Sequence, residues 1–143
     1  MAIKQLTVFV ENKQGTVVSI TDTLAKHNVN IRALSIAETQ DFGILRLLVD
    51  DAAKAETVLL EHGLLVQSTE VVVVAVRDEL GGLASLLEPM AEAGVNIEYM
   101  YSLIGRSSSD AYMVFRVTDT PAFLAMLEEK GLNHGTPAEL GLK

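Results

Sequence analysis

Apolar side chains recur along the first half of the chain with two different spacings. Residues 3–10 alternate apolar and polar positions, which is typical of a strand with one buried face. Val17, Ile20 and Leu24 then recur at the spacing of a helix that packs one face against a sheet. The complete pattern of this half predicts, in order, strand 3–10, helix 16–27, strands 29–38 and 44–50, helix 51–62 and a long β-forming run at 64–76.

The second half repeats this order of elements. An offset of 66 residues brings a loop, a helix and the start of a strand of one half onto those of the other. The matching residues are Asn12 and Asp78, Gly15 and Gly81, Val17 and Leu83, Ile20 and Leu86, Leu24 and Met90, and the triplets 29–31 and 95–97. The predicted elements of this half are helix 83–93, strands 95–103 and 111–118 with a Ser-rich turn at 105–110, and helix 121–130.

The repeat predicts two modules, residues 1–69 and residues 70–131. A half of about 70 residues alone would bury only a marginal core, so we expect the two modules to support each other. The order strand-helix-strand-strand-helix-strand predicts an α+β fold, with two ferredoxin-like βαββαβ modules in tandem and antiparallel sheets. The second module lacks a clear final strand, because many turn-forming residues follow Gly131. We expect residues 132–143 to form a flexible tail.

Composition and charge argue against several classes of function. The net charge is −8, and residues 70–143 carry eleven acidic against five basic residues, or −6 of the total. A polyanion would be repelled, so we expect no nucleic-acid binding. No apolar run approaches the roughly 20 residues of a membrane span, and no signal-peptide pattern opens the chain. These features favour a cytoplasmic protein without membrane contact.

The residue types that carry metal or covalent chemistry are scarce. Cysteine is absent, which excludes disulfides and thiolate ligands, and the three histidines do not have metal-ligand spacing. Ser107, Ser108 and Ser109 lie in a turn without a nearby histidine or a nucleophile-elbow motif. We therefore expect no metal, no cofactor and no catalytic residues.

The loop Glu11-Asn12-Lys13-Gln14-Gly15, followed by a helix and then Val29-Asn30-Ile31, resembles the ACT domain. Two copies over residues 3–131 are similar to a tandem ACT-domain protein. The resemblance implies small regulatory modules that bind amino acids, most often at the contact between two paired modules. It also implies that Asn12 and Asn30 hold a ligand, as in serine-responsive ACT modules. Gln14 and Leu80 stand where the family frequently has proline, and Val10 stands where the serine-responsive modules have a polar ligand contact.

A physical argument supports the same loops. A glycine between a strand and a helix lets a ligand approach the backbone, and the first N–H groups of the helix favour a carboxylate. Asparagine or aspartate nearby could address the ammonium group. The candidate ligand-binding residues are Asn12, Lys13, Gln14, Gly15, Asn30, Ile31, Asp78, Glu79, Leu80, Gly81, Gly82, Asn96 and Ile97.

The same residues allow plainer interpretations. Asn12 and Asp78 could be turn or helix-capping residues, and Asn30 and Asn96 could satisfy the backbone where each strand begins. Our first hypothesis is a non-catalytic regulatory protein that binds a free amino acid between paired modules. We expect it to form a homodimer, and an enzyme of amino-acid metabolism is a candidate partner. The alternatives are a protein-interaction scaffold without a small ligand and a small enzyme, for which no residue set stands out.

Overall fold

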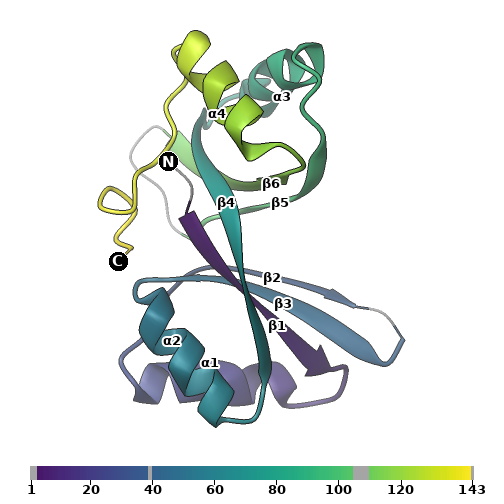
Figure 1. The fold of residues 1–143 in the computed structure, drawn as a ribbon, viewed down its shortest axis with the longest axis vertical. Helices are drawn as coiled ribbons and strands as arrows, with labels where there is room; N and C mark the ends of the chain where they lie inside the picture. Colours follow the sequence, from purple (N-terminus) through teal and green to yellow (C-terminus); the bar gives the residue numbers. More distant parts are fainter. Residues whose placement is uncertain (1–2, 39, 105–109, 143) are drawn as a thin grey trace. The chain divides into compact units, whose positions relative to one another are not determined.

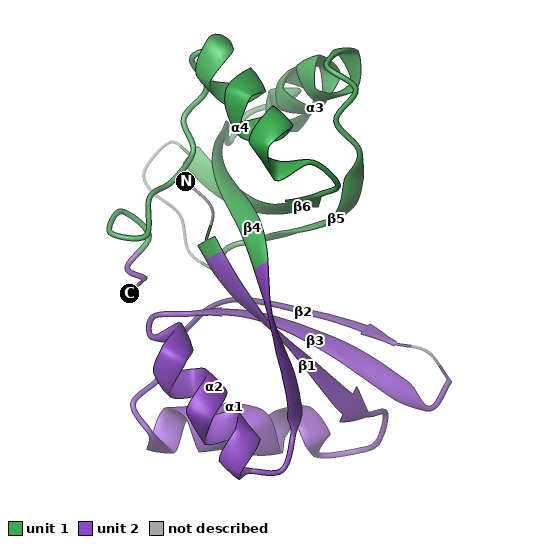
Figure 2. Ribbon diagram, viewed as in Figure 1, with its two compact units in different colours: residues 1–3, 70–140 green, residues 4–69, 141–143 purple. Residues whose placement is uncertain are grey.

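The computed structural model describes residues 3–38, 40–104 and 110–142 of the chain (Figure 1). These residues form two compact units. The N-terminal unit is built on residues 4–69 and the C-terminal unit on residues 70–140, drawn in purple and green in Figure 2. The Ser-rich turn predicted at 105–110 lies outside the described residues, apart from Asp110.

Helices and strands follow each other in the predicted order. The N-terminal unit contains β1 (Ile3–Glu11), α1 (Thr16–Lys26), β2 (Ile31–Glu38), β3 (Phe42–Val49), α2 (Ala52–Glu61) and the start of β4 (Leu65–Arg77). The C-terminal unit contains the rest of β4, α3 (Gly82–Glu92), β5 (Ile97–Ser102), β6 (Asp110–Val117) and α4 (Thr120–Glu129). The predicted β-forming run at 64–76 is thus a single strand, β4, whose residues are divided between the two units.

Hydrogen-bonded strand neighbours follow the order β2-β3-β1-β4-β6-β5, and the β1–β3, β2–β3, β4–β6 and β5–β6 pairs are antiparallel. This arrangement confirms the predicted α+β fold with antiparallel sheets. None of the described helices is long and apolar enough to cross a membrane.

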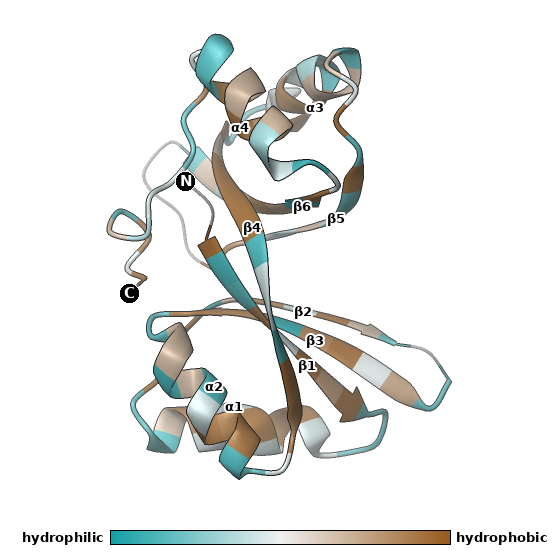
Figure 3. Ribbon diagram, viewed as in Figure 1, coloured by the Kyte–Doolittle hydropathy of each residue, from teal (hydrophilic) through white to brown (hydrophobic). Residues whose placement is uncertain are grey.

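Each unit has its own core, built by the predicted periodic positions. In the N-terminal unit, Ile20 and Leu24 of α1 are buried together with alternate residues of β1 and β3. In the C-terminal unit, Leu86 and Met90 of α3 are buried against a part of β4 that is uniformly hydrophobic and brown in Figure 3. Burial of such side chains contributes about 1.5–3 kcal/mol each, so these two faces hold the helices on the strands.

The segment after α4 takes the place of a final strand in the C-terminal unit. Gly135 N donates to Val73 O at 2.7 Å, Ala75 N donates to Asn133 O at 3.0 Å, and the only strand-like pairing described there is the bridge between Val74 and His134. The prediction that this module lacks a clear final strand is therefore confirmed. Further along, Leu140 is buried. The flexibility expected of residues 132–143 stays a prediction.

Candidate functional site

The loop between β1 and α1 turns sharply at Gly15. Gly15 adopts a left-handed backbone conformation with φ of 86°, and a Cβ atom there would meet nothing within 4 Å. Glycine is therefore favoured by the backbone angle and not by lack of space. Asn12 ties the loop to the β2–β3 hairpin, because Asn12 N donates to Asp41 O at 3.0 Å and Asn12 Nδ2 donates to Glu38 Oε2 at 3.1 Å.

The four helices of the described residues begin in two different ways. Asp51 and Asp119 cap α2 and α4, where their Oδ1 atoms accept hydrogen bonds from Lys54 N at 3.2 Å and Ala122 N at 3.1 Å. In contrast, α1 and α3 begin after Gly15 and Gly81, whose N-cap positions provide no side-chain hydrogen bond. The first N–H groups of a helix have no partner within the helix. The helices that follow the two predicted loops, α1 and α3, therefore lack a side-chain cap, whereas α2 and α4 have one.

A hollow of about 350 Å³ lies beside the first loop, and we call it the N-terminal hollow. Its lining residues are Lys13, Gln14, Gly15, Thr16, Ser19, Ile20, His62 and Leu64. Ser19 Oγ and His62 Nε2 form a hydrogen bond at 3.3 Å that links α1 to the end of α2. Thr16 Oγ1 is buried and has no hydrogen-bond partner among the described residues. This hollow therefore contains backbone, hydroxyl, imidazole and ammonium groups around an apolar base.

The corresponding hollow of the second unit, the C-terminal hollow, has a volume of about 140 Å³. Its lining residues are Ala75, Val76, Arg77, Glu79, Gly82, Ser85, Leu86 and Leu132. Four of these positions match lining positions of the N-terminal hollow at the offset of 66, and Leu132 matches Leu64 at 68. The repeat thus extends from the fold to the hollow itself. Asp78 borders a separate hollow of about 190 Å³ on β4, α3 and β6.

Gly82 and Leu80 have structural explanations. A Cβ atom on Gly82 would lie 2.1 Å from Arg77 O, so only glycine allows the loop to close this tightly. Gly82 N also donates to Glu79 O at 3.0 Å. The side chain of Leu80 is fully exposed and lines neither of the hollows described beside its loop. Leu80 is therefore a weaker ligand candidate than its neighbours, while Gly82 lines the C-terminal hollow and also has this structural role.

Asn30 and Asn96 lie at the other end of α1 and α3 from the loops. Helix α1 has 11 residues, which corresponds to about 16 Å at 1.5 Å per residue. Asn30 O accepts from Asp50 N at 3.0 Å, and Asn96 O accepts from Thr118 N at 3.1 Å. Within one unit, a single amino acid therefore could not reach both the loop and the asparagine.

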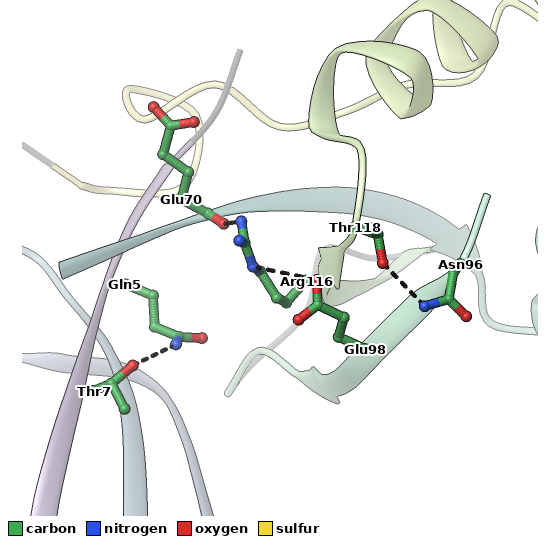
Figure 4. Close-up of polar contacts among 7 residues, drawn as sticks. All are labelled: Gln5, Thr7, Glu70, Asn96, Glu98, Arg116 and Thr118. Carbon is green, nitrogen blue, oxygen red and sulfur yellow. Dashed lines mark hydrogen bonds and ion pairs between the residues drawn. The ribbon is translucent and has the colours of Figure 1, made fainter. Parts of the chain in front are cut away.

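The two asparagines use their side chains differently. Asn96 Nδ2 donates to Thr118 Oγ1 at 2.9 Å (Figure 4), whereas no hydrogen bond of the Asn30 side chain is present within the described residues. Figure 4 also contains Arg116, whose guanidinium donates to Glu70 O at 3.0 Å and lies 3.9 Å from Glu98. Ile31 and Ile97, which follow the asparagines, pack against the two cores. Core packing thus accounts for Ile31 and Ile97 without a ligand. For Asn96, the hydrogen bond to Thr118 accounts for the side-chain amide group.

Sequence reasoning missed five lining residues of the N-terminal hollow, namely Thr16, Ser19, Ile20, His62 and Leu64. The repeat contains a signal for the serine, because Ser19 and Ser85 are identical at the offset of 66 and both line a hollow. His62 and Leu64 follow α2 and are distant from the loop in sequence, so only the fold brings them together with Gly15.

The duplicated units with matching loops and hollows indicate a pair of related modules, and family comparison agrees. The chain belongs to the ACT domain pair family, whose model matches residues 1–134. No curated protein matches the chain.

Solved structures with a similar fold include three proteins. The crystal structure of protein BT0572 from Bacteroides thetaiotaomicron is 38% identical, with 99% of this chain and 96% of that chain covered and a TM-score of 0.91. The ligand-free regulatory subunit of aspartate kinase from Thermus thermophilus is 16% identical, with 88% and 91% covered and a TM-score of 0.63. The Thermus flavus regulatory subunit is 15% identical, with 88% and 90% covered and a TM-score of 0.54. At these identities the two Thermus proteins share the fold alone.

Proposed function

We propose that this chain is a non-catalytic regulatory protein that binds a free amino acid at the N-terminal hollow. The observation that carries the proposal is that a helix start without a side-chain cap borders a hollow of about 350 Å³ at the predicted loop. Ligand pockets typically measure about 300–1,000 Å³, so this volume is suitable for a small molecule.

The carboxylate of the amino acid would bind at the start of α1. Oriented N–H groups and the helix dipole favour a negative charge there, and Thr16 and Ser19 add hydroxyl groups on the same hollow. Lys13 Nζ lies 3.0 Å from Glu11, but these side chains are 70% and 68% exposed. Such an exposed ion pair contributes little, so Lys13 is able to turn toward a ligand.

The N-terminal hollow is the stronger candidate of the two. The C-terminal hollow has about 140 Å³, which is below the usual range for a ligand pocket, and Glu79 replaces Lys13. A carboxylate at the start of α3 would meet this glutamate. We therefore propose that the first loop carries the main ligand site and that the second loop is a weak site or none.

Pairing of modules would complete the site. Asn30 is exposed and its side chain makes no hydrogen bond within the described residues, so it is available to a ligand held by a different copy of the module. We propose that the chain forms a homodimer in which the modules 1–69 and 70–131 of the two copies pair. In this dimer, Asn30 of one copy would face the first loop of the other copy. Because a ligand shifts an equilibrium only through different affinities for two states, binding would alter pairing or the affinity for a partner enzyme of amino-acid metabolism.

Isothermal titration of the folded protein against the twenty amino acids tests this proposal. We expect heat for one amino acid or a few related ones, together with a rise in melting temperature that grows with ligand concentration. Absence of heat and of thermal shift for all twenty, with the protein folded, would contradict the proposed function.

A further inference from the structure

The two helices of the C-terminal unit enclose a groove that is separate from the loop hollows. Its volume is about 440 Å³, larger than that of either hollow. Its lining residues are Pro89, Glu92 and Ala93 on the α3 side and Ala122, Ala125, Met126, Glu129 and Lys130 on the α4 side. We call it the α3–α4 groove.

The α3–α4 groove has small apolar side chains where the N-terminal unit has larger polar ones. Ala93, Ala122 and Ala125 are exposed, while Met126 is buried below them. The matching positions in the first unit are His27, Lys54 and Thr57, at offsets of 66 or 68. Small side chains let the backbone of a binding partner approach closely, as occurs where a helix lies in a groove between two others.

The charged residues within α3 and α4 are all acidic, and Lys130, which follows α4, is the one basic residue that lines the α3–α4 groove. Glu88, Glu92, Glu128 and Glu129 are all exposed, and neither α3 nor α4 contains lysine or arginine; Lys130 follows α4 as its C-cap. Within the described residues, none of these four glutamates forms an ion pair. In the first unit, Lys26 and Lys54 interrupt the acidic residues of α1 and α2. The groove is therefore the region where the acidic charge of the protein flanks an apolar strip.

We propose that the α3–α4 groove binds a basic amphipathic helix of a protein partner. The apolar face of that helix would cover the three alanines, and its lysine or arginine side chains would reach the unpaired glutamates on both sides. A second copy of this chain is disfavoured as the occupant, because each copy carries a net charge of −8 and its own helices are not basic. This partner site is independent of the amino-acid site.

A labelled synthetic peptide tests the proposal. The probe is an amphipathic peptide of about 15 residues, roughly four helical turns, with an alanine and leucine face flanked by lysines. Fluorescence anisotropy should detect saturable binding that weakens as salt is added, because the flanking charges are exposed. A peptide with glutamate in place of each lysine should not bind. Absence of saturable binding by the lysine peptide would overturn the proposal.

Matched variants separate the groove from general attraction to an acidic surface. Ala125→Trp fills the groove and should weaken peptide binding at least about tenfold, while Thr57→Trp at the matching position of α2 should leave it unchanged. The double variant Glu92→Gln and Glu129→Gln should bind the lysine peptide more weakly, and its affinity should depend less on salt concentration. Circular dichroism checks that each variant folds. Peptide binding that responds to the glutamate variant but not to Ala125→Trp, or equally to both tryptophan variants, would overturn the proposal.

Discussion

The hollow beside residues 13–16 and the hollow beside residues 79–82 occupy matching positions of two repeated units, yet their volumes are about 350 Å³ and 140 Å³. The repeat keeps the left-handed glycine at the start of the helix and the serine one turn later. It changes Thr16 to Gly82 and Lys13 to Glu79. Gly82 permits a close approach to Arg77 O that a side chain would prevent, and the second loop is correspondingly tight.

Under the proposed function, this difference separates a loop that binds a ligand from a matching loop that binds weakly or not at all. The residues that shape the turn and the core are shared, because both units need them to fold. Two of the positions that line the hollows differ in size or charge, because Thr16 matches Gly82 and Lys13 matches Glu79. The predictions below therefore alter one member of a matched pair and use the other as its control.

The largest expected effect is on stability at the second loop. Gly82→Ala places a methyl group 2.1 Å from Arg77 O, and we expect a loss of roughly 3 kcal/mol in the free energy of unfolding. Thr16→Ala, at the matching position, should cost less than about 1 kcal/mol. Urea denaturation measures both. Equal losses would contradict the claim that the two loops differ in tightness.

A substitution within the hollow tests ligand binding. Ser19→Leu projects a larger side chain into the N-terminal hollow and should raise the Kd of the bound amino acid at least about tenfold, or 1.4 kcal/mol. Ser85→Leu is the matched control and should leave the Kd unchanged. Isothermal titration gives both values. If Ser85→Leu had the larger effect, the assignment of the site to the first module would be wrong.

The helix starts offer a third comparison. Asp51→Ala and Asp119→Ala remove the side-chain caps of α2 and α4, and each should cost about 1 kcal/mol of stability. Neither should change amino-acid affinity, because the ligand is proposed to bind at the start of α1. Thermal unfolding with and without the ligand separates the two effects. Loss of ligand binding in either variant would count against the proposed site.

The smallest effects concern the two asparagines. Asn96→Ala should cost roughly 0.5–1 kcal/mol of stability, because its side chain donates to Thr118 Oγ1. Asn30→Ala should change the melting temperature little and weaken ligand binding about twofold, or roughly 0.4 kcal/mol. Titration and thermal unfolding of both variants check this. A loss of stability in Asn30→Ala as large as that in Asn96→Ala would favour a purely structural role.

Much of the fold follows from local patterns in the sequence. Helix 16–27 was predicted where α1 spans Thr16–Lys26, and strand 95–103 where β5 spans Ile97–Ser102. Periodic burial is a local property, so these elements and the core positions Ile20, Leu24, Leu86 and Met90 were accessible from the sequence.

Only part of the candidate site could be predicted from the sequence. The loops and their glycines were identified, but the contribution of His62 and Leu64 depends on where the end of α2 lies, which no local pattern specifies. The separation of Asn12 from Asn30 along α1 follows from the helical rise, yet a motif match alone does not reveal it. The α3–α4 groove is a property of the space between two helices, and their separate amphipathic patterns do not predict it.

The most direct test of the central claim is an amide chemical-shift titration of the isotope-labelled protein with the amino acid that gives heat in calorimetry. We predict saturable shifts concentrated at residues 13–16 and at Ser19, with much smaller shifts at residues 79–82. Shifts confined to the second loop, or absent from both loops while the amino acid binds, would contradict the account.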